Sequence, residues 1–118
     1  MIVRTEALGT QTLVVPEGRL DFGAAAGFQE ELERALGAPG SAPAVLVVDC
    51  AALEYVSSAG LRALLLAARA AQRAGIRFGL CALRPAVREV LDLSGFSRII
   101  AVHPDRQSAL GRGPQAPP

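Results

Sequence analysis

The adjacent hydroxyls of Ser57 and Ser58 are the side chains of this sequence best placed to carry chemistry. They stand at the predicted start of a helix that runs from about residue 58 to Ala74 and is closed by Gly75. A serine at such a start commonly accepts a hydrogen bond from an otherwise unpaired backbone N–H, but this structural role explains one serine better than two. If Ser57 is the cap, Ser58 takes the first helical position with its hydroxyl exposed. A phosphate there would meet free N–H groups and the positive end of the helix dipole.

The same predicted helix has two distinct faces. With side chains placed about 100° apart, the face toward the sheet contains Leu61, Leu64, Ala67, Ala68 and Ala71. Arg62, Arg69 and Arg73 form a narrow stripe on the opposite side, and Leu66 falls inside it. An exposed leucine is common by itself. Close to Ser58, however, it would add to a docking surface for another protein.

Two loops at the ends of predicted strands hold the acidic residues of interest. One contains Gly18, Arg19, Leu20 and Asp21 and leads into the first helix, and the other begins at Asp49 and leads to the two serines. In open sheets of the α/β type, sites form beyond the carboxyl ends of the strands. Both loops are therefore candidate site loops.

An enzymatic role for Ser58 would need a base within hydrogen-bond reach and a third group to orient that base. The sequence has no G-x-S-x-G motif, and its only histidine, His103, is distant in the chain. Cys50 and Cys81 lack CxxC spacing and are best explained as small buried residues of a reduced protein. We therefore expect no catalytic activity, no metal site and no cofactor.

The hydrophobic periodicity of the sequence predicts the strands and helices on which these residues lie. Apolar runs at 2–8 and 12–15 predict a hairpin whose ladder Pro16 limits. Further strands are predicted at 44–48, 76–82 and 98–102, with helices on Phe28, Leu32, Ala35 and Leu36, at 58–74, from Pro85 to Gly95 and at 104–110. The predicted fold is α/β, with a mixed, mostly parallel sheet of about four to five strands and about four helices. Residues 1–110 form one domain, and 111–118 a disordered tail.

Composition excludes several classes of protein. The 118 residues are 51% hydrophobic and 19% charged, which predicts a packed globular domain, and the net charge of +1 gives no basic footprint for nucleic acid. The longest strongly apolar stretch, 61–71, is interrupted by two arginines and is too short for a membrane span. With no secretion signal at the N-terminus, we expect a cytoplasmic protein.

Several motifs together resemble the STAS domain of bacterial anti-sigma factor antagonists, also called anti-anti-sigma factors. These motifs are Gly18-Arg19-Leu20-Asp21, Val48-Asp49, Tyr55-Val56-Ser57-Ser58-Ala59-Gly60-Leu61-Arg62, Cys81-Ala82-Leu83-Arg84-Pro85-Ala86-Val87, Leu93-Ser94-Gly95-Phe96 and Ile99-Ile100. They occur in the family's order and at its intervals. The resemblance runs over nearly the full length of the chain.

The resemblance implies a partner-switching circuit. In this family, the unphosphorylated protein binds an anti-sigma factor that is itself an ATP-dependent serine kinase, and this binding releases a sigma factor. Phosphorylation of the serine at the start of the second helix abolishes the binding, and a PP2C-type phosphatase restores it. That serine corresponds to Ser58, and the expected partner-binding residues are Asp21, Ser57, Ala59, Gly60, Arg62 and Leu66.

The chain departs from the family pattern beside the expected phosphorylation site. Many members carry an aspartate where this chain has Ser57, and the residue after Ser58 is Ala59. Serine and aspartate both cap helices, so the fold is not threatened, but Ser57 becomes a competing phosphate acceptor. Asp21 matches the acidic residue that the family carries near the serine, and we expect it to orient the hydroxyl or contact the kinase.

STAS domains also have other roles, and the resemblance leaves these open. They act as accessory subunits of lipid transport systems, as parts of anion transporters and as scaffolds in stress-sensing complexes. The hydroxyl expected to be exposed at Ser58 favours the switch over these roles.

Overall fold

One mixed sheet organises the molecule in the computed structural model, which describes residues 1–38 and 40–111. Its strands are β1 (Ile2–Leu8), β2 (Gln11–Leu20), β3 (Val45–Asp49), β4 (Leu53–Val56), β5 (Arg77–Cys81) and β6 (Ala101–His103). The order across the sheet is β1-β2-β3-β5-β6, and β4 extends it by pairing with β2. Among the described strands, the β1–β2 hairpin alone is antiparallel. The predicted fold class is confirmed, with one strand more than expected, β4.

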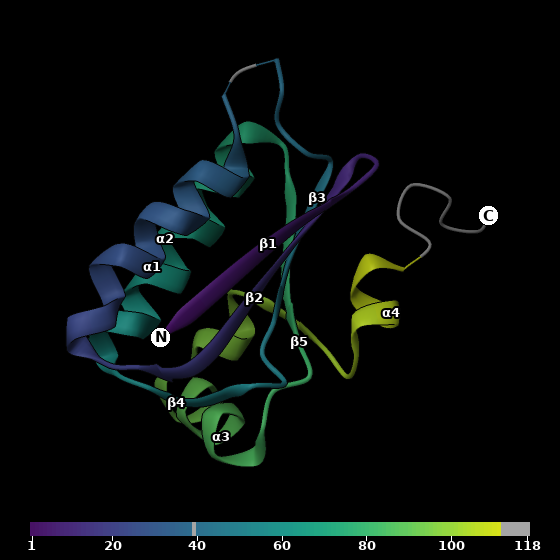
Figure 1. Ribbon diagram of the computed structural model, residues 1–118. Helices are drawn as coiled ribbons and strands as arrows, with labels where there is room; N and C mark the ends of the chain where they lie inside the picture. The colour runs from purple at the N-terminus through teal and green to yellow at the C-terminus, as the bar shows by residue number, and fades with distance from the viewer. Residues whose placement is uncertain (39, 112–118) are drawn as a thin grey trace.

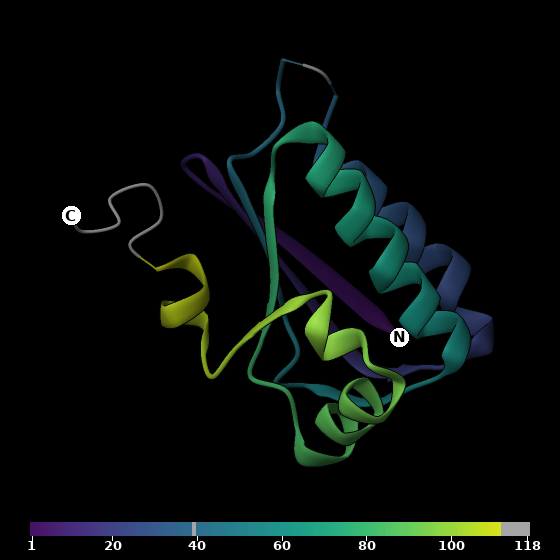
Figure 2. The same cartoon turned by 180° about the vertical axis from the view of Figure 1, so that it is seen from behind.

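The two faces of the sheet are covered unequally (Figures 1 and 2). The long helices α1 (Phe22–Leu36) and α2 (Ser58–Ala74) lie side by side on one face, with α3 (Pro85–Ser94) below them in the view of Figure 1. A short 3-10 turn, η1 (Phe96–Arg98), follows α3, and the single-turn helix α4 (Arg106–Leu110) lies on the opposite face. Among the described residues, no helix is both long and apolar enough to cross a membrane.

The core has two parts because the sheet separates them. The larger part joins the helices to one face of the sheet and includes Phe28, Leu32, Leu46, Leu64, Leu80 and Leu91. The smaller part contains Leu13, Val15, Val45, Val47, Cys81 and, from α4, Ala109. Apolar burial stabilises a fold by about 25 cal/mol per Å². The part beneath the helices holds more of the buried apolar side chains and is therefore expected to contribute more to stability, and α4 covers the other face.

Pro16 does not limit the second strand as predicted. Strand β2 continues through it for ten residues and ends at Leu20. The reason is that β2 changes its parallel neighbour there: Gln11 to Val14 pair with β3, and Gly18 to Leu20 pair with β4. Pro16 lies in the gap between these two pairings. A backbone N–H in this gap would have no partner strand to bond, so proline costs the sheet no hydrogen bond.

The helix ends lie close to where the sequence predicted them, but the last strand does not. Gly75 closes α2 in a left-handed conformation, with φ of 75°. The strand expected at 98–102 is shifted to β6, because η1 and the backbone bonds of Ile99 and Ile100 to the Phe96 carbonyl use the preceding residues for a turn. Apart from Gly111, the tail predicted to be disordered lies outside the described residues.

Candidate functional site

The starts of α1 and α2 lie next to each other because the strands before them are paired. Leu20 at the end of β2 is the parallel partner of Val56 at the end of β4. The backbone N–H of Ser57 donates to the Leu20 carbonyl at 2.8 Å, which ties the two loops together. The two helices then pack side by side along their length. Two positive helix ends therefore meet at one edge of the sheet.

Ser57 and Ser58 occupy different positions at the start of α2. Ser57 is the N-cap: its Oγ accepts from the Gly60 N–H at 3.1 Å, and its carbonyl accepts from the Leu61 N–H at 2.8 Å. Its side chain is half-buried. Ser58 is the first helical residue and is exposed. The hydroxyl of Ser58 is thus accessible to another macromolecule, whereas that of Ser57 is engaged in the cap.

Asp21 is the N-cap of α1 and is exposed beside this site. Its Oδ1 accepts from the Ala24 N–H at 2.9 Å, so the carboxylate has a structural role in its own helix. Among the described residues, no hydrogen bond joins the side chains of Asp21 and Ser58. Of the two roles expected for Asp21, contact with a partner is the one that its exposed position suits.

Gly60 brings α2 into close contact with β2. The glycine is buried, and a Cβ placed on it would lie 2.6 Å from Leu20 Cγ and 3.0 Å from the Leu20 carbonyl oxygen. Any side chain at this position would push the helix start away from the strand. Gly60 was expected at the partner surface, but in the structure it faces inward and sets the position of the two serines.

The outward face of α2 is basic. Arg62, Arg69 and Arg73 are exposed, and Leu66 and Ala59 are half-buried. Ser58 and Arg62 are four residues apart and therefore share one side of the helix. No acidic residue lies in the first turn of α2. An anion on Ser58 would thus meet both the helix dipole and a guanidinium group.

Three exposed side chains lie next to the site, and of these Phe22 was not singled out from the sequence. Phe22, directly after the cap Asp21, is 83% exposed. Arg19 on β2 stacks over the Tyr55 ring on β4, 4.2 Å from its centroid, in a cation–π contact. The helical phase carries a signal for Phe22, because it lies about 120° away from Phe28 around the helix and so cannot share its buried face.

Asp49, at the start of the second candidate loop, has a structural role. Asp49 is only 6% exposed, and its Oδ1 accepts from the Ala51 N–H at 3.0 Å. Its Oδ2 accepts from Nε and Nη2 of Arg106 at 3.0 and 2.7 Å. This hydrogen bonding raises the pKa of Arg106. One oxygen of the Asp49 carboxylate thus holds the loop at Ala51, and the other fastens α4 to the sheet.

The cysteines are buried thiols, as the sequence predicted. Burial raises the pKa of Cys81 to about 12 and also raises the pKa of Cys50. Both thiols are therefore protonated and poorly nucleophilic at neutral pH. Within the described part of the chain, no group of three or more His, Cys, Asp or Glu side chains could hold a metal ion.

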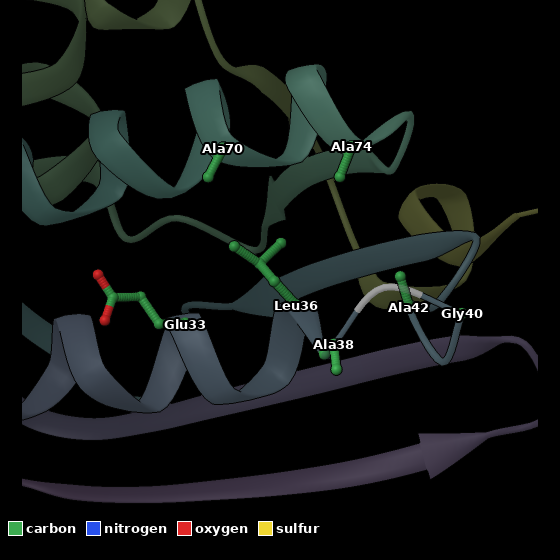
Figure 3. Close-up of a pocket in the computed structure, with 8 residues that line it drawn as sticks. Glu33, Leu36, Ala38, Gly40, Ala42, Ala70 and Ala74 are labelled. Atoms are coloured by element: carbon green, nitrogen blue, oxygen red, sulfur yellow. The ribbon is translucent and has the colours of Figure 1, made fainter.

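The far ends of α1 and α2 border an open pocket of about 480 Å³ (Figure 3). Leu36, Ala70 and Ala74 give it an apolar wall, and among the described residues that line it Glu33 alone is charged. It lies at the opposite end of both helices from Asp21 and Ser58. None of the residues expected to carry function borders it.

Comparison with known proteins identifies the family of the chain. The model of the STAS domain family matches residues 3–109. BtrV of Bordetella bronchiseptica, described provisionally as an anti-sigma factor antagonist, is 44% identical over 64 residues, which cover 54% of this chain and 55% of BtrV. The chain therefore matches about half the length of BtrV.

Two further proteins resemble the chain over most of its length. A Mycobacterium tuberculosis protein, provisionally described as an anti-anti-sigma factor, is 29% identical over 117 residues, covering 96% of this chain and 76% of the relative. The structure of a serine-to-glutamate variant of RsbS from Moorella thermoacetica has a TM-score of 0.77 and 31% identity, covering 92% of this chain and 91% of RsbS. The resemblance seen in the motifs is confirmed, and the chain belongs to the STAS domain family.

Proposed function

We propose that this chain is an anti-sigma factor antagonist that works in the cytoplasm by partner switching. In its unphosphorylated form it binds an anti-sigma factor, which is an ATP-dependent serine kinase, and this binding releases a sigma factor. Phosphorylation of Ser58 ends the binding, and a PP2C-type phosphatase restores it. The names of the similar proteins support the regulatory class, and the residue assignments are our own.

The observation that carries the proposal is the different use of the two serine hydroxyls. Ser58 is exposed at the first position of α2, whereas Ser57 Oγ is held by the Gly60 N–H. A kinase can reach the first without disturbing the fold, but it must break a helix cap to use the second. A cap of this kind contributes about 1 kcal/mol. We therefore expect Ser58 to be the acceptor and Ser57 the weaker alternative.

Magnitudes favour a local mechanism of release. A phosphate at an exposed helix N-terminus gains about 0.3 to 1 kcal/mol from the dipole, and an exposed pair with Arg62 adds a similar amount. Neither is enough to refold a domain. A mismatched charge at an interface costs several kcal/mol, and each 1.4 kcal/mol or so is a tenfold change in affinity. The phosphate is thus expected to block the partner by direct repulsion.

The proposed docking surface surrounds Ser58 and consists of Asp21, Phe22, Ser57, Ala59, Arg62 and Leu66. Phe22 is its expected anchor, since an aromatic side chain that is 83% exposed loses the most contact with water when a partner covers it. Replacement of Phe22 by alanine should weaken kinase binding about tenfold or more. Ile99→Ala is the matched control, because Ile99 is 55% exposed but lies beside Gln72, near the far end of α2.

The phosphorylation site is tested directly by incubating the chain with ATP and a candidate anti-sigma factor serine kinase from the same organism. Mass spectrometry should place the phosphate on Ser58, and a PP2C-type phosphatase should remove it. Ser58→Ala should stay competent to bind the kinase, and Ser58→Asp should bind weakly. Phosphate found only on Ser57 would reassign the phosphorylation site to that residue. If neither serine carried phosphate, the proposal would be overturned.

The local mechanism has its own test. Backbone amide shifts measured by NMR before and after phosphorylation should change only around the starts of α1 and α2. Perturbation spread across β5, β6 and α4 would show a conformational change of the whole domain. That result would contradict release by direct repulsion.

A further inference from the structure

Among the described strands, β1 lies at one edge of the sheet, and its outer side is unpaired. In the described part of the chain, β1 pairs only with β2, and its other edge faces the viewer in Figure 1, with α1 and α2 to one side and α4 to the other. Ile2 and Leu8, near the two ends of the strand, are 62% and 42% exposed. Exposed edges of this kind are templates for pairing with another strand.

The side chains of β1 alternate between the two faces of the sheet. Arg4 pairs with Val15 and Glu6 with Leu13, and both valine and leucine belong to the core beneath α4. Ile2, Arg4, Glu6 and Leu8 therefore share the α4 face. The side chains on this face are therefore, in order, apolar, positive, negative and apolar.

We propose that two copies of this chain pair through β1, antiparallel and centred on Thr5, so that their sheets become continuous. In this register, Arg4 of each copy lies opposite Glu6 of the other, and Ile2 lies opposite Leu8. Opposite charges directly across an antiparallel pair attract, and apolar pairs at the two ends exclude water. The seven residues of β1 are thus complementary to themselves, as a two-fold symmetric interface requires.

Geometry selects this register from its neighbours. A two-fold axis perpendicular to the sheet places residues of the same face opposite each other, so the pair must be centred on a residue. Centring on Arg4 would place two arginines together, and centring on Glu6 would place two glutamates together. Only the pairing centred on Thr5 avoids like charges and uses the whole strand.

Within a single copy, Arg4 already takes part in an ion pair next to the proposed contact. Arg4 Nη2 already lies 2.6 Å from Glu17 Oε2 across the hairpin, with side chains 58% and 36% exposed. In the dimer, Arg4 would lie between Glu17 of its own copy and Glu6 of the partner. Charges on edge strands usually discourage association, but here their order in the sequence makes them attract.

Charge reversal tests the pairing through association measured by analytical ultracentrifugation. The unmodified protein should form dimers as its concentration rises from micromolar to millimolar. Arg4→Glu alone and Glu6→Arg alone should each weaken the dimer at least tenfold, because each variant places like charges together twice. A mixture of the two variants should form a heterodimer, since both facing pairs then have opposite signs. Circular dichroism should show that every variant is folded.

A cysteine placed on the two-fold axis tests the register. Directly opposite residues have Cα atoms about 5 Å apart, within the range of a disulfide. Thr5→Cys should therefore form a covalent dimer on oxidation, whereas Ala7→Cys should not, because its two copies would be about 14 Å apart. Cys50 and Cys81 are 0% exposed and should not interfere. A protein that stays monomeric at millimolar concentration, a mixture that fails to associate, or equal cross-linking at both positions would overturn the proposal.

Discussion

Asp49 and Ser58 both lie at the carboxyl ends of strands, but their side chains have opposite surroundings. Asp49 ends β3, and Ser58 follows β4. The Asp49 carboxylate is buried and accepts three hydrogen bonds, from Ala51 and Arg106. The side chain of Ser58 is exposed at a helix start. Position at a strand end therefore does not identify a functional group; the decisive property is whether the fold has already used its hydrogen-bonding capacity.

The comparison predicts opposite sensitivities. Substitutions around Asp49 should alter the stability of the fold, because each leaves a buried polar group without its partner. Substitutions of Ser58 should alter recognition and leave stability almost unchanged. Ser57 and Gly60 should lie between these extremes, since they belong to the site but also hold it in place.

The largest loss of stability is expected for Arg106→Ala. Removing the guanidinium leaves the Asp49 carboxylate buried without its counter-ion, and α4 loses its fastening. Because the Arg106 side chain is 47% exposed, we expect a loss of about 2 to 3 kcal/mol in the free energy of unfolding, below the range for a fully buried pair. Chemical denaturation measures it. The control Arg69→Ala, on the exposed face of α2, should change stability by less than about 0.5 kcal/mol.

Gly60→Ala should be the next most damaging change. The added methyl group would overlap Leu20, and the resulting shift of α2 should cost about 1 to 2 kcal/mol after the gain in helix propensity. Gly27→Ala is a control of opposite sign, because nothing lies within 4 Å of a Cβ at Gly27 on α1. It should stabilise the protein by up to about 1 kcal/mol. Equal effects in the two variants would show that Gly60 is not a close-contact position.

Local features of the structure were predictable from the sequence, and contacts distant in the chain were not. The cap at Ser57, the end of α2 at Gly75 and the start of α3 at Pro85 depend on residues within one helical turn. The link between Asp49 and Arg106 joins residues 57 positions apart, so neither periodicity nor a short motif indicates it.

Strand pairing and exposure show the same limit. The extension of β2 through Pro16 depends on β4, whose four residues give no clear alternation, buried only at Leu53 and Val56. The exposure of Phe22 follows from its helical phase, but only once the helix is known to begin directly after Asp21. The candidate serines were found because their motif is local. The exposed Phe22 and the stacking of Arg19 on Tyr55 were not, because these three residues come from three different elements.

Ser57→Ala should lower stability by about 1 kcal/mol, because the Gly60 N–H loses its acceptor. Ser57→Asp should retain most of the stability, since aspartate is an equally good N-cap. The melting temperatures of the parent protein, Ser57→Ala and Ser57→Asp, measured under one set of conditions, test both expectations. If the alanine variant were as stable as the parent protein, the cap would contribute nothing, and the distinction between the two serines would lose its physical basis.

Ser58→Ala should give the smallest change in stability of all, within about 0.5 kcal/mol, because the Ser58 hydroxyl is exposed and the cap at Ser57 remains. The same variant should abolish phosphorylation by the partner kinase under the proposed function. Denaturation and phosphate incorporation measured on one preparation separate the two effects. A loss of stability as large as that of Ser57→Ala would mean that the Ser58 side chain supports the fold, and loss of phosphorylation in this variant could then no longer be assigned to a missing acceptor.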